Sequence, residues 1–157
     1  MASFDFDQAE GLRRMLAGSR PRIVTFLSAT PSDDKGAMLV NLGASLVQGG
    51  NEVLIVDACQ RDYGVARRLE LERHVSLLQV ARQECALNQV VQTAPQGFNV
   101  ALLARDGQAP AGSDEARRLA KAFDVLVKKQ SGIVIVDGEL KREGGFTVPL
   151  LADSEIV

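Results

Sequence analysis

The stretch at residues 23–36, IVTFLSATPSDDKG, is the one from which we interpret the rest of the chain. Its first five residues are β-branched, aromatic or aliphatic, and this composition predicts a buried strand. After Lys35, apolar residues recur at the spacing of one helix face, at Met38, Leu39, Leu42, Leu46 and Val47. A strand, a short polar loop, a lysine and a helix follow one another in this order in a phosphate-binding loop.

The composition limits what kind of protein this is. With 157 residues, the chain is long enough for one domain with a substantial core. Its net charge of −2 gives no indication of nucleic acid as a partner. No segment has the features of a signal peptide or of a membrane span, and the single histidine cannot complete a metal site with Cys59 and Cys85. We therefore expect a cytoplasmic protein with reduced cysteines, no metal centre and no stable membrane insertion.

Predicted strands and helices continue to alternate along the chain after this first strand and helix. Apolar runs predict further strands at residues 52–57, 98–103 and 132–137, and the start of another at 154–157. Apolar spacing predicts a helix over residues 114–129, short helices near residues 75–80 and 87–91, and a loop at residues 138–147. This alternation is typical of an open α/β sheet. Asp57 and Asp137 each end a strand, so we expect them to meet residues 28–36 at the carboxyl edge of the sheet, where such folds bind ligands.

A separate helix is predicted before this domain. Asp7 can cap it, and Glu10 follows at the spacing of a capping box. Gly18 and Pro21 end the helical pattern and lead into extended chain. We therefore divide the chain into an N-terminal helix and linker at residues 1–20 and an α/β domain at residues 21–157.

Four segments of the α/β domain resemble the MinD/ParA family of deviant Walker A P-loop ATPases. They are VNL at residues 40–42, VLIVDA at 53–58, IVIVD at 133–137 and LADSEIV at 151–157. The resemblance implies a three-layer, parallel-sheet domain of the P-loop NTPase-like, Rossmann-like kind. Because the family continues with further strands, the domain looks C-terminally shortened, and a partner or a second copy would then cover the sheet edge.

The N-terminal helix resembles a narrower group. Residues 7–13, DQAEGLR, are similar to the D-Q-A-x-x-L-R motif of the flagellar-number regulators FlhG and FleN. The resemblance implies that this helix binds an FlhF-like GTPase. The contact residues would be Asp7, Gln8, Ala9, Leu12 and Arg13. The alternative is a capped helix whose identity with the motif is accidental.

The loop itself departs from the family pattern K-G-G-V-G-K-T. Of that pattern this chain keeps only Lys35, to which, with Gly36, the resemblance assigns nucleotide contact. Pro31 has no N–H to offer a phosphate, and Asp33 and Asp34 put negative charge where a triphosphate would lie. Gly36 stands where the family has the threonine whose hydroxyl holds Mg²⁺. We therefore expect no cofactor, with ATP and Mg²⁺ bound only if the loop is functional after all.

The two strand-end carboxylates allow two interpretations. By resemblance, Asp57 and Asp137 match the switch I and Walker B aspartates, and they would serve catalysis if the site were active. The alternative, which we favour given the loop, is that each carboxylate has a structural role at a strand end beside a helix N-terminus.

These observations support three hypotheses, and the sequence leaves open whether the chain is an enzyme. The first is an FlhG/MinD-like regulator of flagellar number or placement, a non-hydrolysing scaffold that acts through partners. An FlhF-like GTPase or a flagellar transcription regulator would be such a partner, and could recruit the protein to the cell pole or inner membrane. The second is a weak but genuine ATP-binding ATPase of the MinD/ParA type. The third is an unrelated doubly wound binding module, which nothing in the sequence supports.

Overall fold

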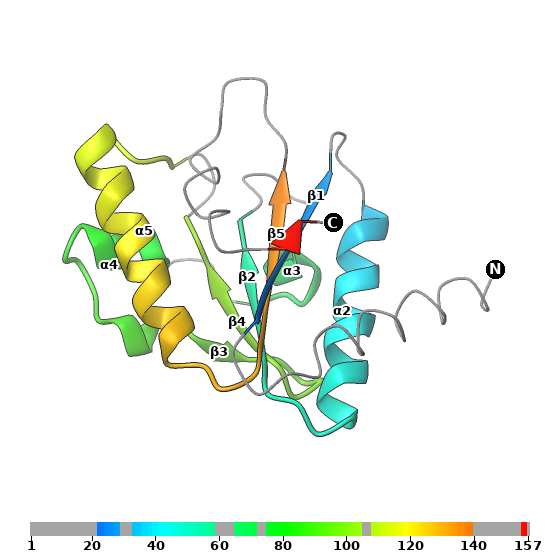
Figure 1. The fold of residues 1–157 in the computed structure, drawn as a ribbon. Coiled ribbons are helices and arrows are strands. Elements are labelled where there is room, and N and C mark those ends of the chain that lie inside the picture. Colours follow the sequence, from blue (N-terminus) through cyan, green and yellow to red (C-terminus); the bar gives the residue numbers. More distant parts are fainter. Residues whose placement is uncertain are drawn as a thin grey trace.

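A computed structural model of the chain describes residues 22–28, 33–58, 65–71, 75–104, 108–139 and 155–156. The predicted N-terminal helix, the tip of the loop at residues 29–32 and most of the segment at residues 138–147 lie outside these ranges. Figure 1 shows a central sheet between two layers of helices. None of the described helices is both long and apolar enough to cross a bilayer.

The sheet has six strands in the order β3-β4-β2-β5-β1-β6. Their bounds are β1 Arg22–Ser28, β2 Val53–Asp57, β3 Gln92–Thr93, β4 Asn99–Leu102, β5 Ile133–Glu139 and β6 Glu155–Ile156. Every neighbouring pair is parallel except β3 with β4, which is antiparallel. The predicted α/β architecture is confirmed, but the sheet is mixed rather than wholly parallel. The two-residue β3 is too short to show a pattern in the sequence, and only its pairing identifies it.

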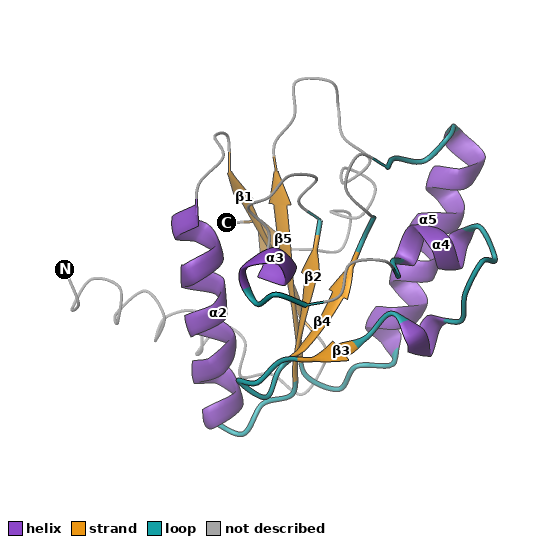
Figure 2. Cartoon of the chain, turned by 180° about the vertical axis from the view of Figure 1, so that it is seen from behind, coloured by secondary structure: helices purple, strands orange, loops and turns teal. Residues whose placement is uncertain are grey.

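The helices divide between the two faces of this sheet. Their bounds are α2 Asp33–Gln48, α3 Val65–Arg68, α4 Leu77–Ala81, the 3₁₀ helix η1 Leu87–Gln89 and α5 Ser113–Lys128. The two views show α2 and α3 over one face and α4 and α5 over the other (Figures 1 and 2). The helices predicted between residues 35 and 129 are present, although α2 starts two residues before Lys35 and α3 was not predicted individually. The predicted N-terminal helix is not among the described residues.

Alternating side chains of the central strands supply two apolar cores. On β2, Leu54 and Val56 pack with α4 and α5, whereas Val53 and Ile55 pack with α2 and α3. Because both faces are covered, the strand is apolar at its first four positions, as its sequence indicates. The same alternation directs the next residue, Asp57, to the face that carries α2 and α3.

One predicted boundary is wrong. The sequence pattern ends the fourth predicted strand at Asp137 and starts a loop at Gly138, but β5 continues to Glu139. The extra residues pair with the end of β1, Leu27 with Gly138 and Ser28 with Glu139. Parallel neighbours supply the backbone partners, and this pairing overrides the weak strand propensity of glycine.

Candidate functional site

The candidate site lies at the carboxyl edge of the sheet, where β1, β2 and β5 end and α2 begins (Figure 1). Asp57 and Asp137 are direct partners in the β2–β5 register, and the amide of Ala58 donates to the carbonyl of Asp137 at 2.8 Å. The two aspartates are 3% and 0% exposed. The fold therefore places two carboxyl groups side by side on one face, in a nearly water-free position.

Lys35 reaches this pair from the first turn of α2. Its Nζ lies 2.8 Å from Oδ1 of Asp137, and it also donates to the backbone carbonyl of Gly138. The lysine side chain is 11% exposed and that of Asp137 is fully buried. The predicted phosphate-binding cation is thus engaged by the predicted Walker B carboxylate and by the backbone of β5.

Asp57 has a different partner. Its Oδ2 accepts a hydrogen bond from the backbone amide of Ala66 at 2.9 Å, and this contact is buried. Ala66 is in the first turn of α3, where backbone amides have no intrahelical acceptor. The carboxylate therefore caps α3 and ties it to the end of β2.

The remaining predicted residues add little to the site. Gly36 is buried in the first turn of α2, and it has no hydroxyl that could hold a metal ion. The five predicted partner-binding residues of the N-terminal helix lie outside the described ranges. Within the described ranges, no group of three or more His, Cys, Asp or Glu side chains comes together as a metal site would require.

These residues do not fit a magnesium nucleotide in the arrangement that the structure has. Lys35 would have to leave Asp137 before its ammonium could reach a phosphate, and this would break a buried ion pair. In addition, Gly36 lacks the oxygen that the metal needs.

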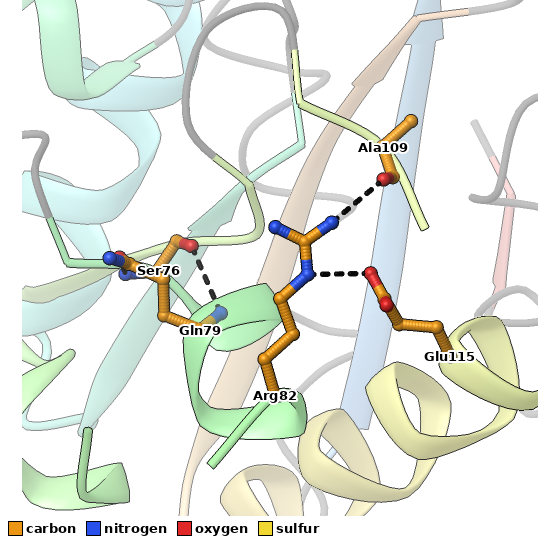
Figure 3. A network of polar contacts seen from close by, with 5 residues as sticks. All are labelled: Ser76, Gln79, Arg82, Ala109 and Glu115. Atoms are coloured by element: carbon orange, nitrogen blue, oxygen red, sulfur yellow. Dashed lines mark hydrogen bonds and ion pairs between the residues drawn. The ribbon is translucent and has the colours of Figure 1, made fainter. Parts of the chain in front are cut away.

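A second polar network lies on the other face of the sheet, and the sequence did not reveal it. Nε of Arg82, at the end of α4, lies 2.7 Å from Oε1 of Glu115 in α5 (Figure 3). The same guanidinium donates to the carbonyl of Ala109 at 3.4 Å. The N-terminus of α4 carries a capping box, in which Ser76 and Gln79 exchange backbone and side-chain bonds. Of these contacts, only the Ser-x-x-Gln spacing is visible in the sequence.

No protein-family model and no curated protein sequence matches the chain. Solved structures do match it. The kinase domain of the Escherichia coli tyrosine kinase ETK superposes with a TM-score of 0.70 at 18% identity, over 93% of this chain and 59% of that one. The MinC:MinD cell division protein complex of Aquifex aeolicus superposes with a TM-score of 0.66 at 16% identity, over 86% of this chain and 54% of that one. Cobyrinic acid a,c-diamide synthase of Mycobacterium smegmatis, with bound ADP and magnesium, superposes with a TM-score of 0.64 at 18% identity. The match covers 82% of this chain and 54% of that one.

These likenesses establish the fold. The chain has the three-layer α/β architecture of P-loop NTPase-like domains, and it spans little more than half the length of the structures that it matches. At such low identity, the comparisons do not carry an activity from those proteins to this one.

Proposed function

We propose that the chain is a regulatory scaffold with a P-loop NTPase-like fold that does not hydrolyse ATP and acts by binding partners. The ion pair between Lys35 and Asp137 is the observation that carries this proposal. In an ATPase the lysine would be available to the β- and γ-phosphates. Here its charge is already compensated, and a nucleotide would have to displace a buried carboxylate to use it.

The altered loop supports the same conclusion. Restoring a phosphate site would require backbone amides in place of Pro31, removal of the charges of Asp33 and Asp34, and a hydroxyl at Gly36. Each change acts on a different part of phosphate or metal binding. Their combination is what we expect of a site that no longer binds a nucleotide.

For the partner, we propose an FlhF-like GTPase, bound through the helix at residues 7–13. The support is the sequence DQAEGLR, which is similar to the activating motif of the flagellar-number regulators. Through this contact the scaffold would regulate flagellar number or placement, at the pole or inner membrane to which the partner recruits it. A flagellar transcription regulator and a second copy of the chain are further proposed partners.

Calorimetry with Mg-ATP tests the loss of nucleotide binding. We expect no binding heat for the wild-type chain at about 100 μM ATP. The dissociation constant would then exceed about 100 μM, which means a binding free energy weaker than about 5–6 kcal/mol. A variant with the family loop, Thr30→Lys, Pro31→Gly, Ser32→Gly, Asp33→Val, Asp34→Gly and Gly36→Thr, should gain binding. The same variant with Lys35→Ala is the matched control and should lose that gain. Micromolar binding by the wild-type chain would contradict the proposal.

GTP turnover by an FlhF-like GTPase tests the partner. We expect the full chain to stimulate turnover, and Leu12→Ala and Arg13→Ala to remove the stimulation by truncating the proposed contact face. Arg14→Ala is the matched control, because Arg14 lies next to the motif but outside it. Equal loss in all three variants, or no stimulation by the wild-type chain, would refute this partner.

A weak ATPase is the second candidate, and one observation favours it. Lys35, Asp57 and Asp137 do converge at the carboxyl edge of the sheet, where the fold binds nucleotides. The structurally similar cobyrinic acid a,c-diamide synthase holds ADP and magnesium. If this chain acts likewise, it should release phosphate from ATP, and Lys35→Ala should abolish the release. Turnover that survives this substitution would argue against catalysis at this site.

A further inference from the structure

The outer face of α2 has an unusual composition for the exposed side of a helix. From Gly36 to Gln48 the helix contains no charged residue. Its inner side contributes leucines to the core that it covers. The side chains of its outer side are exposed or half-buried, and they are Ala37, Met38, Asn41, Ala44, Ser45 and Gln48. Neutral and mostly small side chains therefore form the outer face of α2.

The helix α5 shows the opposite composition. It is also 16 residues long, it lies on the other face of the sheet, and it exposes Arg117, Lys121 and Lys128 (Figures 1 and 2). Covering a charged side chain costs free energy because it loses water, whereas methionine and neutral side chains are covered at a lower cost. Met38, in the outer face of α2, is 40% exposed. The outer face of α2 is therefore the one suited to contact with another apolar surface.

The N-terminal segment of the same chain has a matching composition. The helix predicted there from the sequence has Arg13 and Arg14 on one side, and its other side is apolar, with Ala9, Leu12, Met15 and Leu16. A helix of this length is not stable alone in water. Its apolar side therefore needs a surface on which to pack.

The linker between this segment and the sheet is short. It comprises residues 17–21 and ends where β1 begins, at Arg22. Arg22 and Val53 are both register partners of Ile133, so the starts of β1 and β2 lie two strand spacings apart, about 10 Å. The helix α2 ends at Gln48, just before β2, and packs on this sheet. A linker of five residues extends to about 17 Å, so it keeps the N-terminal segment within reach of α2.

We propose that the segment at residues 7–16 docks as a helix on the outer face of α2 of its own chain. The face of one such helix is about 24 Å long and about 10 Å wide, far smaller than the roughly 800 Å² that each partner buries in a stable complex. A tethered segment needs less surface, because a short linker gives it an effective concentration in the millimolar range. The small size of the face thus favours the tethered segment over a second copy of the chain.

This docking would regulate the proposed function, and that consequence rests on the proposed partner. Leu12 lies on the apolar side of the predicted helix and is also one of the residues proposed to contact the GTPase. When the helix is docked on α2, Leu12 is covered. The partner therefore has to compete with α2 for the same side chain, so docking is autoinhibitory.

Hydrogen exchange of the full chain, measured without any partner, tests the docking. We expect the amides of residues 9–16 to exchange about tenfold more slowly in the wild-type chain than in Met38→Arg, which places a charge in the proposed contact. Asn41→Arg, on the same face, should have the same effect. Val125→Arg is the matched control, because Val125 is also 40% exposed but lies on α5, and it should keep the wild-type rate.

Three results would overturn the docking. The first is exchange of residues 9–16 in the wild-type chain as fast as in a synthetic peptide of residues 1–20. The second is equal exchange in the wild-type chain, Met38→Arg and Asn41→Arg. The third is protection that increases with protein concentration, because a second copy would then occupy the face.

Stimulation of an FlhF-like GTPase tests the autoinhibition separately. Met38→Arg should reach half-maximal stimulation at about tenfold lower concentration than the wild-type chain or Val125→Arg, because its helix is free to bind. Equal concentrations for all three would overturn the autoinhibition. If no variant stimulates the GTPase, the proposed partner is wrong, whereas the difference in exchange between Met38→Arg and Val125→Arg still supports the docking.

Discussion

Three ionisable residues at the carboxyl edge of the sheet have partners that differ from those of a nucleotide site. Lys35 bonds Asp137 and a backbone carbonyl, and Asp57 bonds an amide of α3. All of these contacts are internal to the domain, and each joins a strand end to a helix start. At this scale, residue types that are typical of phosphate chemistry serve to connect structural elements.

The bond between Asp57 and the Ala66 amide leads to the first prediction. Asp57→Ala should lower the free energy of unfolding by about 1–3 kcal/mol, because it leaves a buried amide without an acceptor. Asp57→Asn removes the same negative charge but keeps an oxygen that can accept the bond, so its loss should be smaller. Urea unfolding of the two variants measures the difference. Equal losses would show that the charge of Asp57, rather than its hydrogen bond, is what matters.

At the scale of elements, α4 depends on its neighbours. A five-residue helix is too short to be stable alone. Its first turn is held by the capping box of Ser76 and Gln79, and its end is held by the contact of Arg82 with Glu115 (Figure 3). The second contact fixes α4 against α5, so the two helices should behave as one layer.

A double-mutant cycle on Arg82 and Glu115 tests this coupling. The two side chains are 27% and 19% exposed, and we expect a coupling free energy of about 0.5–1 kcal/mol by urea unfolding of Arg82→Ala, Glu115→Ala and the double variant. The pair Arg117 and Asp114 on the same helix is the matched control, because its atoms are 3.9 Å apart and both side chains are about 80% exposed. This control pair should show no measurable coupling. Additive losses for Arg82 and Glu115 would mean that their contact does not join the helices.

At the scale of the whole molecule, the two apolar cores share the central strands. β2 and β5 contribute alternate residues to both clusters. Because the two cores share these strands, disruption of one core should also destabilise the other. A domain of this size and construction is expected to unfold in one cooperative step.

Substitution in a central strand tests this cooperativity. Ile135 is fully buried on β5 in the core under α2, and Ile135→Ala should lower the free energy of unfolding by about 2–5 kcal/mol. Hydrogen exchange should show the same loss for amides of β4, β2 and β5. Val125→Ala, at a position 40% exposed on α5, is the control and should change stability by less than about 0.5 kcal/mol. A loss confined to one face of the sheet would contradict a shared core.

Local pattern in the sequence was enough for most of the architecture. Apolar runs located β1, β2, β4 and β5, and the helical spacing located α2 and α5 within a few residues. These elements are visible because each one buries a continuous face, and burial imposes a period on the sequence. The convergence of Lys35, Asp57 and Asp137 at one edge also followed from the alternation of strands and helices.

What each of these side chains bonds was decided by tertiary structure alone. Lys35 and Gly138 are 103 residues apart in the chain, and the acceptor exists because β5 continues beside β1 past the point where its apolar run ends. The helix α3, whose Ala66 amide bonds Asp57, has only four residues and leaves no periodic signal in the sequence. The same is true of the antiparallel pairing of β3 with β4. Residue types at an edge follow from local pattern, but the partner of a charge depends on which segments the fold brings within hydrogen-bonding distance of it.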